Sequence, residues 1–117
     1  MKKYTGEIFW ITGDYKKGYT AGCSKCIVSR AILNEGVFKI DHNNPNNYPN
    51  SEITLRAKEG FSFDGSMKYL DEKTSSAMVN LKLYENKKNT ILIGSWIEGG
   101  AVSTCIVELK EVKEFKN

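Results

Sequence analysis

Cysteine and histidine are the residues of this chain whose types and spacing could support chemistry. Residues 23–26 read Cys-Ser-Lys-Cys, and the chain has one further cysteine and a single histidine. Four ligands of these types can hold a zinc ion. No second Cys-x-x-Cys occurs, so the one metal site that the sequence offers would combine Cys23, Cys26, Cys105 and His42. The alternatives are a redox pair, which the absence of a helix after the motif disfavours, and buried or idle thiols. No cofactor is expected.

His42 is also the natural candidate for a general base, and a general base needs a partner that orients it. Asp41 and Asn43 flank it, but neighbours in an extended chain point to opposite faces. We therefore expect His42 on a loop surface. Carboxylates could form an acid–base pair instead, although acidic residues are common in turns without any catalytic role. Those near the same end of the predicted fold are Asp14, Asp41, Asp71, Glu72 and Glu98. No hydrolase or zinc-peptidase motif is present.

The chain alternates between apolar and polar residues over most of its length, which predicts half-buried β-strands. The pattern is clearest from residue 61 to residue 112, where short polar breaks separate the alternating segments. Both prolines fall outside the predicted strands, as strand pairing requires. The predicted strands are Tyr4–Thr12, Cys26–Leu33, Val37–Asp41, Glu52–Lys58, Phe61–Leu70, Ser76–Glu85, Thr90–Ile97 and Ala101–Val112.

These strands predict an all-β fold with residues 1–117 in one domain. Short connections make sequential strands antiparallel neighbours, so the expected architecture is an eight-stranded antiparallel meander. Pairing of the first strand with the last would close the meander into a barrel and remove its exposed edges. A sandwich of two four-stranded sheets is the alternative.

The predicted connections are short at one end of the barrel, while the two long ones lie at the other end. These long connections, residues 13–25 and 42–50, form an open mouth, where barrel ligands normally bind. Aromatic residues and the single histidine fall on these loops or on the strand ends beside them. The expected ligand-binding residues are Trp10, Tyr19, His42, Tyr48, Tyr69 and Trp96. The alternative is that the two tryptophans only plug the barrel end.

A meander with short turns at one end and Trp and Tyr at the other resembles the avidin and lipocalin barrels, together called calycins. Residues 94–100, Gly-Ser-Trp-Ile-Glu-Gly-Gly, look like the Gly-x-Trp hairpins of those proteins. In lipocalins the motif lies near the first strand, whereas here it lies in the seventh predicted strand, and Gly6 and Trp10 lack its spacing. The resemblance implies an up-and-down barrel and a general ligand-binding habit, but no particular ligand.

Composition narrows the possible partners. The net charge is +3 with Lys and Glu interspersed, so the basic stripe of a nucleic-acid-binding protein is not expected. No apolar run approaches the roughly 20 residues of a membrane helix. No apolar signal segment follows Lys2 and Lys3, so we expect a cytoplasmic protein.

Two functions then remain. The first is a non-catalytic barrel that binds a small apolar or amphipathic ligand at its mouth. The alternative is a protein-binding module, such as an inhibitor, an immunity protein or an anti-defence protein, that uses the same loops or an exposed strand face. Residues 4–12, 26–33 and 90–97 are apolar on both strand faces, which would suit a protein partner or a homodimer. An enzyme is the least favoured function.

Overall fold

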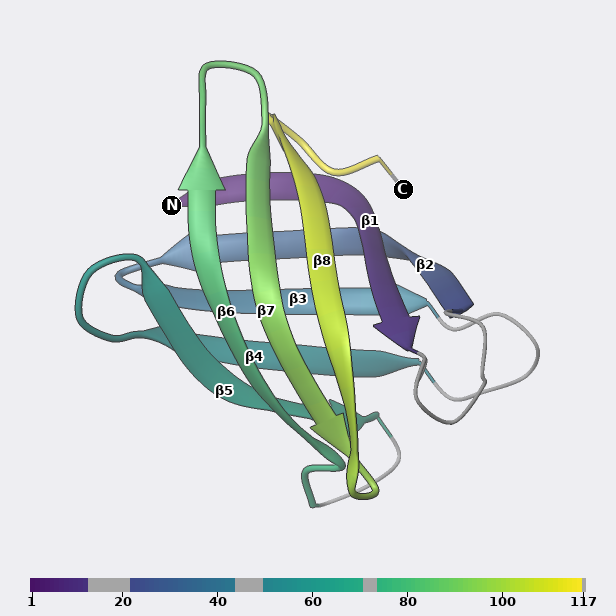
Figure 1. The fold of residues 1–117 in the computed structure, drawn as a ribbon. Coiled ribbons are helices and arrows are strands. Elements are labelled where there is room, and N and C mark those ends of the chain that lie inside the picture. The colour runs from purple at the N-terminus through teal and green to yellow at the C-terminus, as the bar shows by residue number, and fades with distance from the viewer. Residues whose placement is uncertain (13–21, 44–49, 71–73, 117) are drawn as a thin grey trace.

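The structure, a computed structural model, describes residues 1–12, 22–43, 50–70 and 74–116, without the side chains of Gly22 and Cys23. Each strand pairs antiparallel with the next, and β1 also pairs with β8, so the sheet is a closed barrel (Figure 1). The predicted eight-stranded meander and its closure are thus confirmed. Within the described ranges no helix could span a membrane. The strands are β1 (Lys2–Thr12), β2 (Gly22–Asn34), β3 (Val37–Asn43), β4 (Ser51–Ala57), β5 (Ser62–Tyr69), β6 (Ala77–Glu85), β7 (Thr90–Glu98) and β8 (Ala101–Val112).

The barrel is flattened into two layers. β2, β3 and β4 form one layer and β6, β7 and β8 the other, and the strands of the two layers cross at a steep angle (Figure 1). β1 and β5 bend from one layer into the other (Figure 1). Each of these two strands carries an inward glycine, Gly6 and Gly65, where a Cβ would collide with a backbone carbonyl of the neighbouring strand. The sheet can therefore close tightly at its corners because these positions have no side chain.

The register fixes which side chains point into the barrel. Directly opposed residues share a face, and even-numbered residues of β1 point inward. In β2 the parity changes, because Ser29 is an extra residue in the pairing with both β1 and β3. This β-bulge turns Val28 and Ala31, three residues apart, into the same core. The alternation of the sequence had not indicated it.

The middle of the barrel is filled with apolar side chains. Ile40 and Ile53 on one layer, Leu81 and Leu92 on the other, and Ile8 on β1 between them are each 0% exposed. A side chain with no exposure lines neither the outer surface nor an internal void large enough for water. This part of the interior is therefore solid, and a bound molecule would have to lie nearer to an end of the barrel.

Some predicted boundaries were wrong at the strand ends. β2 begins at Gly22, so residues 22–25 belong to a strand and not to the predicted loop 13–25. β3 continues through Asn43, so His42 is a strand residue and not the start of the predicted loop 42–50. Phe61 lies in the turn before β5. Polar residues at 22–25 and 42–43 had obscured the pairing that the neighbouring strands impose, whereas the apolar Phe61 had indicated the start of a strand.

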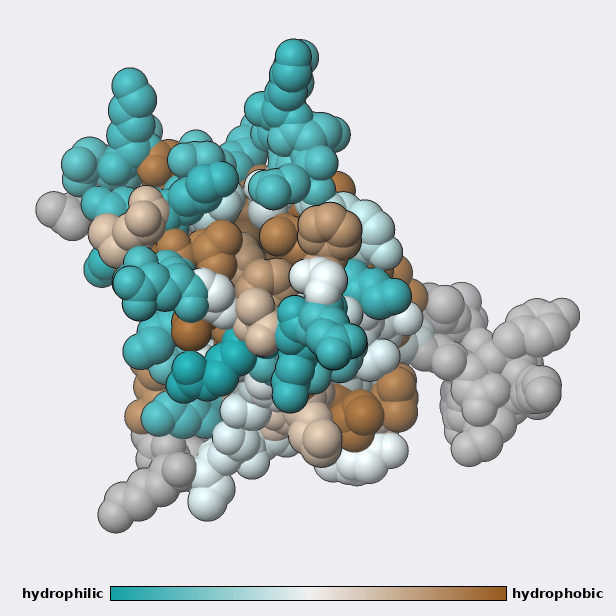
Figure 2. All heavy atoms as spheres, turned by 90° about the vertical axis from the view of Figure 1, so that its left-hand side faces the viewer, coloured by the Kyte–Doolittle hydropathy of each residue, from teal (hydrophilic) through white to brown (hydrophobic). Residues whose placement is uncertain are grey.

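The outer surface of the barrel is partly apolar. Met78, Ile97 and Val102 stand directly opposite one another on β6, β7 and β8, and are 69%, 40% and 67% exposed. Apolar side chains are also exposed on the side that carries the β2–β3 and β4–β5 turns, where charged and polar side chains surround them (Figure 2). The prediction that some strands are apolar on both faces is thus confirmed for β7, whose Ile93 and Ile97 point outward.

Candidate functional site

Six side chains from five strands gather at the end of the barrel where the mouth was predicted, and we call them the rim cluster. The register places this end at the last residues of β1, β3, β5 and β7 and the first residues of β2, β4, β6 and β8. Inward-facing residues at these strand ends must approach one another as the barrel closes. The rim cluster consists of Trp10, His42, Ser51, Tyr69, Trp96 and Glu98.

Three rings of the rim cluster pack edge to face. The ring centroids of Trp10 and Trp96 lie 5.2 Å apart with an interplanar angle of 81°. His42 lies 5.3 Å from Trp10 and 6.2 Å from Trp96, again with steep angles. Such geometry is favourable because the positive edge of one ring meets the negative face of another. The expected gathering of both tryptophans and the histidine is therefore what the structure shows.

His42 is buried, which corrects the expectation that it lies on a loop surface. It is 2% exposed and points into the barrel, as do Phe38 and Ile40 earlier in β3. Its Nε2 lies 2.8 Å from the hydroxyl oxygen of Ser51, the residue directly opposite on β4. The hydrogen bond explains how an imidazole is tolerated there. Phe38 and Ile40 are two residues apart and point inward, so the same alternation continued from Ile40 would have placed His42 inward as well.

The Ser51–His42 pair resembles half of a nucleophilic triad, but its surroundings do not suit catalysis. Ser51 is 1% exposed, and the rings of Trp10 and Trp96 pack around His42. A substrate carbonyl could reach the Ser51 hydroxyl only after these rings had moved. The pair is therefore best understood as a satisfied polar contact inside the barrel.

Glu98 closes the outer side of the rim cluster. Its Oε1 accepts a hydrogen bond of 2.9 Å from Trp96 Nε1, and its Oε2 accepts one of 2.9 Å from the Tyr69 hydroxyl. Glu98 had been named only as one of several carboxylates near this end. Its role could have been found from spacing, since residues two apart in a strand share a face and Trp96 and Glu98 are two apart.

The indole nitrogen of Trp10 differs from that of Trp96, which donates to Glu98. Trp10 Nε1 is buried and has no hydrogen-bond acceptor among the described residues. A buried donor without an acceptor costs about 1–3 kcal/mol, so native proteins seldom leave one unexplained. Trp10, Tyr69 and Glu98 are half-buried, whereas Trp96 is 4% exposed. The rim cluster thus has a solvent-facing side that a small molecule could contact.

The thiols do not form a ready metal site. Cys26 and Cys105 are both buried. Burial raises the pKa of Cys26, and it raises the pKa of Cys105 to about 12, so neither thiol favours the thiolate that binds metal. Among the described residues no three His, Cys, Asp or Glu side chains are grouped as metal ligands would be. The side chain of Cys23 lies outside the described residues, so the proposed four-ligand set stays a prediction.

Two further predicted site residues, Tyr19 and Tyr48, also lie outside the described residues. The same holds for Asp14, Asp71 and Glu72. Of the six residues predicted to bind a ligand, the structure therefore brings four together, namely Trp10, His42, Tyr69 and Trp96. Ser51 and Glu98 complete the rim cluster.

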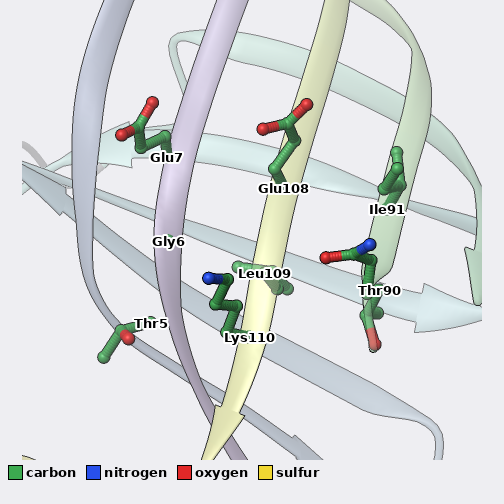
Figure 3. Close-up of a pocket in the computed structure, with 9 residues that line it drawn as sticks. Thr5, Gly6, Glu7, Thr90, Ile91, Glu108, Leu109 and Lys110 are labelled. Carbon is green, nitrogen blue, oxygen red and sulfur yellow. The ribbon is translucent and has the colours of Figure 1, made fainter. Parts of the chain in front are cut away.

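A second concave region lies on the outer wall of the barrel, where β1, β8 and the start of β7 meet (Figure 3). It encloses about 470 Å³, and Glu7 and Glu108 face each other across the β1–β8 pairing. Lys25 lies 3.6 Å from the Glu7 carboxylate. This groove holds no aromatic ring and no unpaired buried donor, so we take the rim cluster as the candidate site.

No family model, curated protein or solved structure matches the chain.

Proposed function

We propose that this protein is a calycin-like, non-catalytic barrel that binds a small amphipathic molecule at the rim cluster. The observation that carries the proposal is the buried Trp10 Nε1, which has no acceptor among the described residues and lies at the edge of a packed aromatic group. Because Nε1 itself is covered, a ligand oxygen would accept this hydrogen bond once the side chains around the indole have shifted. The apolar part of the ligand would lie against Trp10 and Tyr69, which are half-buried.

The solid interior supports a ligand at the mouth and not inside the barrel. Ile8, Ile40 and Ile53 fill the space directly below the rim cluster. A long acyl chain, which a hollow barrel would take inside, has no room there in this arrangement. The proposal is therefore a compact ligand held at the mouth, with the main recognition by rings and a few polar groups.

The test is a screen of small polar aromatic and amphipathic compounds by thermal shift and by tryptophan fluorescence. Both tryptophans lie in the rim cluster, so every ligand that binds there changes the fluorescence. Trp10→Phe should weaken each such ligand, whereas Ile93→Ser on the outer face of β7 should not. A compound that stabilises the protein without changing its fluorescence would contradict the proposal.

The outer face of the barrel supports a second candidate function, a protein-binding module or a homodimer. Met78, Ile97 and Val102 form an exposed apolar row across β6, β7 and β8. Exposed apolar rows on sheets mark protein contacts more often than chance. Sedimentation of the wild type and of Val102→Ser tests the homodimer, because the substitution should dissociate a dimer formed by this row. A monomer at all concentrations would contradict the homodimer.

A further inference from the structure

Glu98 is a carboxylate without a cation. In the part of the chain that the structure describes, it makes no ion pair; the ion pairs found there join Lys3 to Glu114 and Lys25 to Glu7. No other member of the rim cluster is a lysine or an arginine. The two donors that hold Glu98 are a phenol and an indole, which are neutral and leave its charge uncompensated.

The carboxylate is also held in a fixed position. Tyr69 comes from β5 and Trp96 from β7, and each donates to a different oxygen of Glu98. A carboxylate has about four acceptor positions, so roughly two stay open after these bonds. Glu98 is half-buried at the end of β7, so part of the residue is in contact with solvent.

Aromatic rings beside this carboxylate add a second attraction for positive charge. Trp10 and Tyr69 are partly exposed, and the face of an indole or phenol ring attracts a cation electrostatically. Trp96 joins the two parts of the cluster, because it contacts Trp10 through its ring and Glu98 through its Nε1. A fixed carboxylate next to aromatic faces is the combination that favours organic cations over neutral molecules.

We propose that the rim cluster selects a small organic cation, whose charged nitrogen lies at Glu98 and whose body lies against Trp10 and Tyr69. This inference depends on the proposed function and names the class of its ligand. It also explains why the described residues place no basic side chain at Glu98, since such a side chain would occupy the position of the ligand.

The experiment compares two cations with uncharged molecules of the same shape. The pairs are choline with 3,3-dimethylbutan-1-ol and acetylcholine with 3,3-dimethylbutyl acetate, so that cation and neutral partner carry the same oxygens. Each compound is titrated up to about 10 mM into the full chain and followed by tryptophan fluorescence. At least one cation should bind about tenfold or more tightly than its neutral counterpart. This preference should shrink as salt concentration rises, because salt screens an exposed charge.

Two variants show whether Glu98 is the cause. Glu98→Gln should reduce the cation preference to about onefold, while Glu114→Gln, at the far end of the barrel, should leave it unchanged. If Glu98→Gln does not fold, the salt dependence in the wild type decides. Equal binding of cation and neutral partner would overturn this inference and leave the proposed function standing. A fluorescence response to none of the four compounds would also overturn it, whereas the wider ligand screen decides the function itself.

Discussion

Trp96 Nε1 donates a hydrogen bond of 2.9 Å to Glu98, the residue two positions further along β7. The same carboxylate accepts the Tyr69 hydroxyl from β5 at 2.9 Å. β6 lies between β5 and β7 in the sheet, so Glu98 joins two strands that do not pair with each other. This end of the barrel therefore has an internal crosslink of side chains in addition to its backbone pairing.

The first prediction concerns this crosslink. Glu98→Ala should lower the free energy of unfolding by about 1–3 kcal/mol, because it leaves the buried Trp96 Nε1 without its acceptor. Urea denaturation measures the change. Glu114→Ala is the matched control, since its ion pair with Lys3 is 3.9 Å long and exposed and should contribute little. Equal effects of the two substitutions would contradict the structural role of Glu98.

The second prediction compares the two tryptophans. Phenylalanine removes one ring at either position, but Trp96 is the more buried of the two and, among the described residues, it alone loses a hydrogen bond to the protein. Trp96→Phe should therefore be more destabilising than Trp10→Phe by roughly 1.5 kcal/mol. Thermal or urea denaturation of both variants tests this difference. A larger loss for Trp10→Phe would show that Trp10 Nε1 does have an acceptor in the folded protein.

The third prediction concerns the close approach of backbone at an inward glycine. A Cβ on Gly94 would collide with the carbonyl oxygen of Asn80 on β6, so Gly94→Ala should cost at least about 3 kcal/mol. Gly60→Ala is the control: Gly60 has a φ of +66° but open space around its Cα, and its replacement should cost about 1 kcal/mol. Circular dichroism during thermal unfolding gives both values. A mild Gly94→Ala would mean that β6 and β7 can separate there without loss of the fold.

Period two in the sequence was enough to predict the strands, because most of them have one mainly apolar face. Closure of the barrel was predicted from the need to pair the two edge strands. It was not enough for the faces of Trp10 and Trp96, since Phe9 and Ile97 beside them are also apolar. Only the register around the closed sheet places both indoles inside. The bulge at Ser29 was also not predictable, because an extra residue appears in pairing with the neighbouring strands and not in composition.

The candidate site was predicted in part for a related reason. Trp10 and Trp96 belong to strand ends that the barrel brings together, so their proximity followed from topology alone. The position of His42 did not, because the asparagines and prolines after it favoured a loop that begins too early. The missing acceptor of Trp10 depends on how side chains pack at the rim, which no pattern of residue types contains.

The fourth prediction follows from the thiol of Cys105. Burial raises its pKa in the folded protein to about 12 from an ordinary 9.0. The unfolded protein therefore loses this proton at lower pH than the folded one, so stability is complete below pH 9 and falls as the pH rises toward 12. Between pH 8 and pH 10 the loss should be roughly 1.4 kcal/mol.

Cys105→Ala isolates this contribution because it lacks the thiol. The difference in unfolding free energy between wild type and Cys105→Ala should change by that amount over the same pH range, as measured by urea denaturation. Other groups titrate equally in both proteins and cancel. A constant difference would show that the Cys105 thiol is in contact with water.

The most direct test of the account is nuclear magnetic resonance of the two indole N–H groups, which the chain's two tryptophans provide. Trp10→Phe assigns the signals. When a compound that stabilises the protein is added, the account predicts that the Trp10 signal moves downfield as its Nε1 gains an acceptor, and that the Trp96 signal changes with it. Binding that shifts backbone amides on the outer face of β6–β8 and leaves both indole signals unchanged would contradict a ligand site at the rim cluster.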